Sequence, residues 1–225
     1  MAVRLSITEW SERNLQLTSP KKGAMTCDLP CFFRRNRMIS LSVIERAPAM
    51  DRIRLGLQGR DEEIEHICEM LTNMGAVGIG IWCYNFMAVF GWLRTSTTTP
   101  TRGGALVTSY DHTLMWEAPL TEFGTVSEER LWDNFAYFLE WVVPVAERAR
   151  VKLALHPDDP PISPIRGIAR IITSVDALKR AIALVPSACN GLTFCQGTIT
   201  TMGGRHPCGH SFLWRAAADP FRAFP

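Results

Sequence analysis

The sequence lacks a strong charge of either sign. Its 24 basic and 22 acidic residues leave a formal net charge of +2, and the basic residues are scattered along the chain. Domains that bind nucleic acids normally carry a basic patch or stripe, so we expect no nucleic-acid partner. Small acidic metabolites are not excluded as substrates, because they respond to the local field of a site rather than to net charge.

The chain also lacks the features of a secreted domain. Seven cysteines are an odd number, and they show no regular spacing. Cys27 and Cys31 have a near zinc-knuckle spacing, but no second pair completes the pattern. The start "MAVRLSITEW" has no apolar core of signal-peptide length. We therefore expect a cytoplasmic protein without a disulfide framework.

One uncharged run, from Met74 to Leu93, has the length of a bilayer span. It contains four glycines, Asn85 in its middle and no basic residue at its start. These features are more typical of a helix end, a turn, a buried strand "GIGIWCYNF" and a loop. We expect no membrane-spanning segment.

The middle of the chain alternates helical and strand patterns. "DEEIEHICEMLTNMG" has one apolar helical face and acids in its first turn, with Gly75 as the expected stop. Ser127 and Ser174 are expected to cap two further amphipathic helices. Continuous apolar strands between helices favour a parallel sheet covered by helices. The strands are expected near residues 39–45, 78–84, 151–156 and 191–196.

No glycine-rich turn of the dinucleotide-binding kind follows any of these strands, and there is no phosphate-loop motif. The informative polar residues lie instead at the carboxyl ends of strands, where (β/α) barrels place their chemistry. A barrel is therefore preferred to an open doubly wound sheet. A complete barrel has eight strands and typically about 250 residues. The fold class expected is thus α/β, of the (β/α)8 TIM-barrel type, as a partial barrel of about four strands.

Two strand endings, "VKLALHPDDPP" and "GLTFCQG", suggest a metal site. His156 and Cys195 are one strand–helix–strand unit apart, so adjacent strands would bring their ends within about 5 Å. An imidazole and a thiolate can share a divalent ion, and this donor set suits Fe(II), Zn or Mn. Catalytic metal sites usually take three protein ligands, so the pair alone is incomplete. Alternatively, Cys195 is a small core residue and His156 is satisfied by hydrogen bonds.

Asp158 and Asp159 could act as general bases or orient His156. Alternatively, they form a turn between prolines, with carboxylates that accept backbone N–H groups. His206, Cys208 and His210 also resemble ligands, but they lie in a segment without a structural pattern and are considered incidental.

Several segments together resemble one family, mannonate dehydratase. They are "LSVIERAPAMDRIRLGLQGRDEEIEHICEML", "CYNFMAVFGWLRT", "RGGALVTSYD", "PVAERARVKLALHPDDPPISPIRGIARI" and "GLTFCQGTITTMG". The resemblance covers about residues 40–203 and is most specific from 141 to 203. It implies a (β/α)8 barrel that binds Fe(II) or Mn(II). It also implies a hydro-lyase that converts D-mannonate to 2-dehydro-3-deoxy-D-gluconate in hexuronate (glucuronate) catabolism. The sequence is compatible with a homo-oligomer but does not determine the oligomeric state.

The resemblance assigns roles to individual residues. The histidine of "HPDDPP" and the cysteine of "FC" are metal ligands in the family, which implies this role for His156 and Cys195. Tyr84 and Arg94 fall in the segment "YNF…RT" and are expected to contact the substrate at the mouth of the site. The catalytic base is left unassigned.

The chain also departs from the family pattern. Ala88 and Gly91 stand where the family has proline and aspartate. The family's remaining ligands would follow residue 203, where the resemblance stops. We expect a divergent segment at 1–38, the barrel-like domain at 39–203 and an aberrant tail at 204–225. A one-nucleotide shift in a back-translation of the tail gives the family-like "ADIPAAIRSFGERRRIHFVHF", which suggests a frameshift. The alternative to an active enzyme is therefore an inactive remnant of the family.

Overall fold

The computed structural model describes residues 41–202 and 223–224, which form a parallel sheet with helices packed on it. The sheet has five strands in the order β1-β2-β5-β6-β7, and every neighbouring pair is parallel. Strands that neighbour each other in the sheet follow one another along the chain, as in successive strand–helix–strand units. The strands are β1 (Val43–Glu45), β2 (Ile81–Tyr84), β5 (Lys152–Leu155), β6 (Asn190–Thr193) and β7 (Ala223–Phe224).

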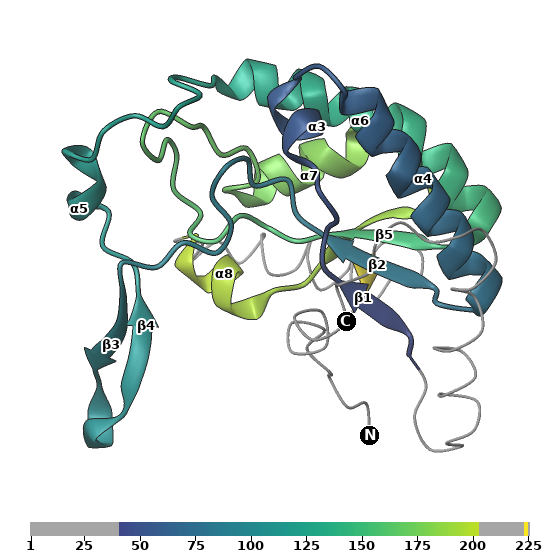
Figure 1. Ribbon diagram of the computed structural model, residues 1–225. Coiled ribbons are helices and arrows are strands. Elements are labelled where there is room, and N and C mark those ends of the chain that lie inside the picture. The colour runs from purple at the N-terminus through teal and green to yellow at the C-terminus, as the bar shows by residue number, and fades with distance from the viewer. Residues whose placement is uncertain (1–40, 203–222, 225) are drawn as a thin grey trace, which may run out of the picture.

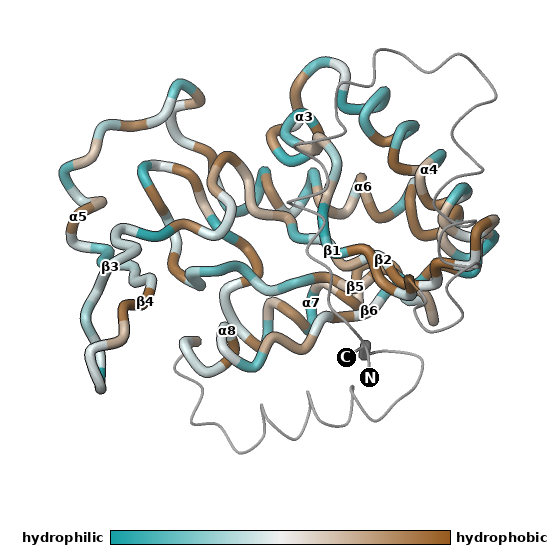
Figure 2. The backbone as a smooth tube through the Cα atoms, turned by 60° about the horizontal axis from the view of Figure 1, so that its bottom comes forward, coloured by the Kyte–Doolittle hydropathy of each residue, from teal (hydrophilic) through white to brown (hydrophobic). Residues whose placement is uncertain are grey.

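Four helices lie together on one face of this sheet (Figure 1). They are α3 (Asp51–Leu55), α4 (Arg60–Val77), α6 (Glu128–Ala149) and α7 (Val175–Leu184). Alternate strand residues point toward them, including Trp82 and Tyr84 on β2 and Leu153 on β5, all within one buried cluster. Figure 2 shows the same strands as largely hydrophobic along their length. A strand covered by helices needs this apolar character, as the sequence predicted.

The helices α6 and α7 begin directly after the two serines that were expected to cap them. The Ser127 hydroxyl accepts a hydrogen bond from the Arg130 N–H at 3.3 Å, and Ser174 accepts one from the Ala177 N–H at 3.1 Å. Each serine therefore satisfies an N–H group that has no partner within its helix. Both predicted caps are confirmed.

The predicted stop at Gly75 is wrong by three residues. The helix α4 runs to Val77 and ends where Gly78 takes a left-handed conformation, with φ of 80°. Gly75 has a different role. A Cβ atom there would lie 2.3 Å from the Ala149 carbonyl oxygen at the end of α6. The absence of a side chain allows α4 and α6 to approach closely at this point.

The opposite face of the sheet carries small side chains. The Thr193 hydroxyl donates to the Ala154 carbonyl at 3.0 Å and lies 2.9 Å from the Cys83 sulfur. Cys83 and Ala154 are buried and form a small cluster of their own. In a complete (β/α) barrel this face would point into the interior, where side chains from alternate strands pack in layers.

A hairpin with a short helix projects from the sheet and its helices (Figure 1). It consists of β3 (Ser96–Pro100), the 3-10 turn Arg102–Gly104, β4 (Leu106–Ser109) and α5 (Thr113–Trp116). Leu106 and Trp116 are highly exposed, the latter at 73%. The sequence patterns do not predict this hairpin. Its threonine-rich strand favours β structure but carries no buried apolar alternation.

The expected fold class is confirmed as a partial (β/α) barrel, and all four expected strands are present with shorter bounds. The fifth strand, β7, lies within residues 204–225, which were expected to be an aberrant tail. The segment 1–38, like His206, Cys208 and His210, lies outside the described residues. No helix within 41–202 or 223–224 is long and apolar enough to cross a membrane.

Candidate active site

The carboxyl ends of three strands meet at one edge of the sheet. Tyr84 at the end of β2 pairs with Leu155 at the end of β5, which pairs with Leu192 near the end of β6. The His156 N–H continues the ladder by donating to the Tyr84 carbonyl at 2.7 Å. The loops that follow these strands therefore leave the sheet side by side, which is the arrangement that a site shared by His156 and Cys195 requires.

His156 is nearly buried, with 5% of its surface exposed. Its Nδ1 lies 2.6 Å from the Pro157 carbonyl oxygen. Because a carbonyl only accepts hydrogen bonds, Nδ1 carries a proton, and in the neutral ring Nε2 is the nitrogen with the lone pair. The Trp92 and His156 rings pack at a steep angle to each other, with 5.6 Å between ring centres. The histidine is thus held in the tautomer that can bind a metal through Nε2.

Cys195 lies two residues beyond β6 and is half-buried. It is the N-cap residue of the short helix α8 (Gln196–Thr201), and its sulfur is 3.1 Å from the Thr198 hydroxyl. Since β5 and β6 are neighbours, His156 and Cys195 follow adjacent strand ends, as predicted. Their imidazole and thiol chemistry suits a transition metal. However, no group of three or more His, Cys, Asp or Glu side chains gathers within the described ranges, so these residues supply two ligands at most.

Asp158 is fully buried in the loop after His156. Its Oδ2 accepts from the Ile172 N–H at 3.0 Å, and its own N–H donates to the Ile172 carbonyl at 3.0 Å. Burial raises the pKa of the Asp158 carboxyl, although nearby Arg170 and the backbone donors act in the opposite direction. The turn with backbone N–H donors, the alternative considered for this residue, is what the structure contains. It is Pro157, not Asp158, that hydrogen-bonds to the imidazole.

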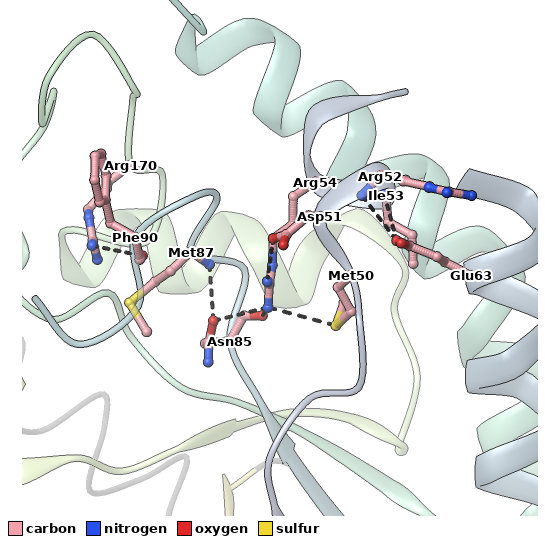
Figure 3. Close-up of polar contacts among 10 residues, drawn as sticks. All are labelled: Met50, Asp51, Arg52, Ile53, Arg54, Glu63, Asn85, Met87, Phe90 and Arg170. Carbon is pink, nitrogen blue, oxygen red and sulfur yellow. Dashed lines mark hydrogen bonds and ion pairs between the residues drawn. The ribbon is translucent and has the colours of Figure 1, made fainter. Parts of the chain in front are cut away.

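Arg170 connects this loop to the loop after β2. Its side chain is buried, and Nη2 donates to the Phe90 carbonyl oxygen at 3.0 Å (Figure 3). The same nitrogen donates to the Gly91 carbonyl oxygen at 2.9 Å. Burial lowers the pKa of the Arg170 guanidinium, and the neighbouring Asp158 carboxylate opposes that effect. A buried guanidinium needs such acceptors, because an unpaired buried charge costs several kcal/mol. Arg170 therefore fixes the position of residues 90–91 relative to Asp158.

A second arginine connects the same two loops in the reverse direction. Arg94, from the loop after β2, donates to both oxygens of Asp159, at 3.0 and 2.8 Å. Such a paired arrangement is the strongest geometry for a guanidinium and a carboxylate. Three of the five Arg94 N–H groups are engaged, two with Asp159 and one with the Leu93 carbonyl, so the paired face of the guanidinium is occupied and only the second Nη2 proton and the Nε proton remain as donors. The prediction that Arg94 contacts substrate is untested, and Asp159 binds Arg94 rather than His156.

Tyr84 lies on the helix-covered side rather than at the mouth of the site. It is 1% exposed, and its ring centre is 4.9 Å from that of Trp82 and 5.8 Å from that of Phe138. Burial raises the pKa of the Tyr84 hydroxyl, which has no hydrogen-bond partner among the described residues. Alternation along β2 explains the location, because Tyr84 and Trp82 share a face. The geometry gives no support to the predicted contact with substrate.

Sequence reasoning missed Arg54, Asn85 and Arg170. The Arg54 guanidinium is buried and donates to the side-chain and main-chain oxygens of Asn85 (Figure 3). Asn85 could have been predicted as a site residue, because it directly follows a buried strand, as His156 does. The two arginines gave no such signal, since their acceptors are remote in sequence.

Comparison with known proteins identifies the relatives of this chain. The family model described as D-mannonate dehydratase (UxuA) matches residues 34–123 and 116–205. A mannonate dehydratase of Thermotoga petrophila is 38% identical over 192 residues, covering 72% of this chain and 53% of that protein. One from Streptococcus agalactiae serotype Ia is 36% identical over 183 residues, with 71% and 52% covered. The crystal structure of mannonate dehydratase from Streptococcus suis serotype 2 has 36% identity and a TM-score of 0.67, covering 74% of this chain and 49% of that one. The chain thus spans about half the length of these relatives.

Proposed function

Because the chain belongs to the D-mannonate dehydratase family, we propose that its site serves the dehydration of D-mannonate to 2-dehydro-3-deoxy-D-gluconate. The observation that carries the proposal is the pair His156 and Cys195 at adjacent strand ends, with the histidine held in a metal-binding tautomer. In this proposal the protein is a cytoplasmic hydro-lyase of hexuronate breakdown. Sugar acids are small anions, and a chain with little net charge can bind one through local contacts.

The proposed cofactor is Fe(II) or Mn(II), with Nε2 of His156 and the thiolate of Cys195 as ligands. When bound, such an ion acts as a Lewis acid on substrate oxygens and eases loss of the C2 proton and departure of the C3 hydroxyl. The Pro157 carbonyl keeps the imidazole in one orientation through its bond from Nδ1. The Thr198 hydroxyl, 3.1 Å from the Cys195 sulfur, can hydrogen-bond the thiolate.

The loops after β2 and β5 supply the rigidity of this site. Arg94 and Arg170 cross-link them at separate points, through Asp159 and through the carbonyls of Phe90 and Gly91. Catalytic groups need to be held within a fraction of an ångström. A histidine at the base of two cross-linked loops meets this requirement. No catalytic base is proposed.

A non-catalytic role is the second candidate. It is favoured by the donor set, because the described residues offer two ligand-type side chains after adjacent strand ends and no group of three, whereas a catalytic metal site usually takes three. Under this reading the chain binds a metal weakly or not at all, since affinity depends on a preformed set of ligands.

The decisive experiment uses the 225-residue chain with Mn(II) or, without oxygen, Fe(II). Metal affinity and the 2-keto product formed from D-mannonate are measured together, with the Streptococcus suis enzyme as a positive control. We expect His156→Ala and Cys195→Ser to lower both signals at least tenfold. His66→Ala, on the exposed side of α4, and Cys68→Ser, at the edge of the core, are the matched controls. Product formation that survives His156→Ala contradicts the proposed site. Absence of product, together with weak Mn(II) binding or none, supports the non-catalytic reading.

A further inference from the structure

Asn85 occupies the position beside His156 at the edge of the sheet. Tyr84 pairs with Leu155, so continuing the register by one residue places Asn85 opposite His156. The His156 N–H bond to the Tyr84 carbonyl belongs to the Tyr84–Leu155 pairing and holds His156 beside the end of β2, where Asn85 follows. Side chains at paired positions of adjacent strands point to the same face, about 5 Å apart. Asn85 therefore neighbours a proposed metal ligand.

The orientation of the Asn85 amide is fixed by two donors. Its Oδ1 accepts from Arg54 Nη2 at 3.2 Å and from the Met87 N–H at 3.2 Å. Because both groups only donate, the oxygen must face them, which places the nitrogen on the other side of the amide. In Figure 3 the Asn85 nitrogen points away from Arg54. In the part of the chain that the structure describes, this nitrogen donates to no group.

Arg54 is committed to Asn85. Its Nη2 also donates to the Asn85 main-chain carbonyl at 3.0 Å and lies 3.8 Å from the Met50 sulfur, while Nη1 bonds to Asp51 at 3.3 Å. The guanidinium is buried, 9% of the residue being exposed. It reaches from α3 to the end of β2 and bonds both oxygens of one residue. A buried cation that donates two hydrogen bonds to one residue restricts the position of that residue closely.

We propose that Asn85 donates a hydrogen bond from Nδ2 to an oxygen of the sugar acid held beside His156, and that Arg54 is the positioning residue for this amide. The inference rests on the proposed function and adds a substrate contact to it. A hydroxyl or carboxylate oxygen fits the donor, since both accept a hydrogen bond. The 8% exposure of Asn85 leaves room for little more than such a contact.

Asn85→Asp separates this role from a purely structural one. Aspartate keeps the oxygen that accepts from Arg54 and Met87, replaces the Nδ2 donor with an acceptor, and adds a negative charge that the adjacent Arg54 guanidinium can pair with. Asn85→Ala instead removes the acceptor as well and leaves the Arg54 guanidinium without its side-chain partner. We therefore expect Asn85→Asp to keep the unfolding midpoint of the wild type and Asn85→Ala to lower it.

The test is D-mannonate binding to the Mn(II)-loaded chain, measured by calorimetry beside binding of Mn(II) alone and unfolding. We expect Asn85→Asp to weaken mannonate binding about tenfold or more, as loss of a hydrogen bond to a charged ligand predicts, with Mn(II) affinity within threefold of the wild type. Mannonate binding at the wild-type level overturns the inference. A loss matched by equal losses of stability or Mn(II) affinity also overturns it. A wild-type chain that binds Mn(II) but no mannonate contradicts the proposed function itself, and the inference with it.

Two further measurements address Arg54. The side-chain amide signals of Asn85, identified in NMR spectra by their absence from Asn85→Asp, should shift when D-mannonate is added to the chain loaded with diamagnetic Zn(II). In Arg54→Met these signals should move before substrate is added, and mannonate binding should weaken about tenfold, with partial rescue in Arg54→Lys. Asn85 signals that ignore mannonate in the wild type rule out the proposed contact.

Discussion

The helix-covered face of the sheet and the loops at its carboxyl edge differ in how they are held together. On the helix-covered face, aromatic and branched side chains from β2, β5, α4 and α6 form one continuous buried cluster. At the carboxyl edge, the loops are held by directional bonds from three arginines, Arg54, Arg94 and Arg170. Apolar burial is roughly proportional to area and tolerates modest repacking, whereas each polar contact requires a particular partner. The first region supplies stability, and the second supplies the geometry of the site.

The largest expected effect is on the helix-covered face. Phe138→Ala should lower the free energy of unfolding by about 3–5 kcal/mol, because it removes a fully buried ring and leaves a cavity. Urea unfolding monitored by circular dichroism measures this loss. Trp141→Ala, on the exposed side of the same helix, should cost far less. Equal costs at the two positions would mean that the helix layer is not the source of stability.

Arg170→Met should have the next largest effect, about 2–4 kcal/mol, because it strands two carbonyl groups and leaves the buried Asp158 without its neighbouring cation. Hydrogen exchange should show the opening concentrated in residues 85–94 and 157–172. Arg148→Met, an exposed position on α6, is the control. Uniform loss of protection across the helices would remove the distinction between the two regions.

Gly75→Ala should cost about 1–3 kcal/mol, although alanine is the better helix former, because the added Cβ meets the Ala149 carbonyl. Thermal unfolding of this variant is compared with that of Gly80→Ala, where an added Cβ meets nothing within 4 Å. A more stable Gly75→Ala would show that α4 and α6 yield easily at this contact.

The smallest effect is expected for the pair Arg94 and Asp159, which is partly exposed, at 28% and 22% of the side-chain surfaces. A double-mutant cycle of Arg94→Met and Asp159→Asn should give a coupling energy of about 1 kcal/mol or less, reduced by salt. Proteolysis of the loops should nevertheless accelerate in both single variants. An unchanged rate of loop proteolysis in these variants would mean that Arg170 alone holds the two loops together.

The main helices and strands could be predicted from the sequence, whereas the contacts that hold the loops at the carboxyl edge could not. Apolar periodicity and caps such as Ser127 and Ser174 depend on neighbours within a few residues, so the sequence revealed the helices and strands. His156 and Cys195 could be singled out because each follows a buried strand. The arginine contacts could not, because Arg54 meets Asn85 across 31 positions and Arg94 meets Asp159 across 65. The end of α4 was misplaced because Gly75 is required by the approach of α6, which no local pattern indicates.

The cross-links made by Arg94 and Arg170 also determine how the loops after β2 and β5 can be exchanged between relatives. Each of the two loops carries the donor for one cross-link and an acceptor for the other. If residues 85–94 alone were replaced by those of a relative, Asp159 and Arg170 would each face a partner from another protein. Replacing 157–172 alone would do the same to Arg94. The transplantable unit is therefore the pair of loops, and substitutions in one should be accompanied by substitutions in the other.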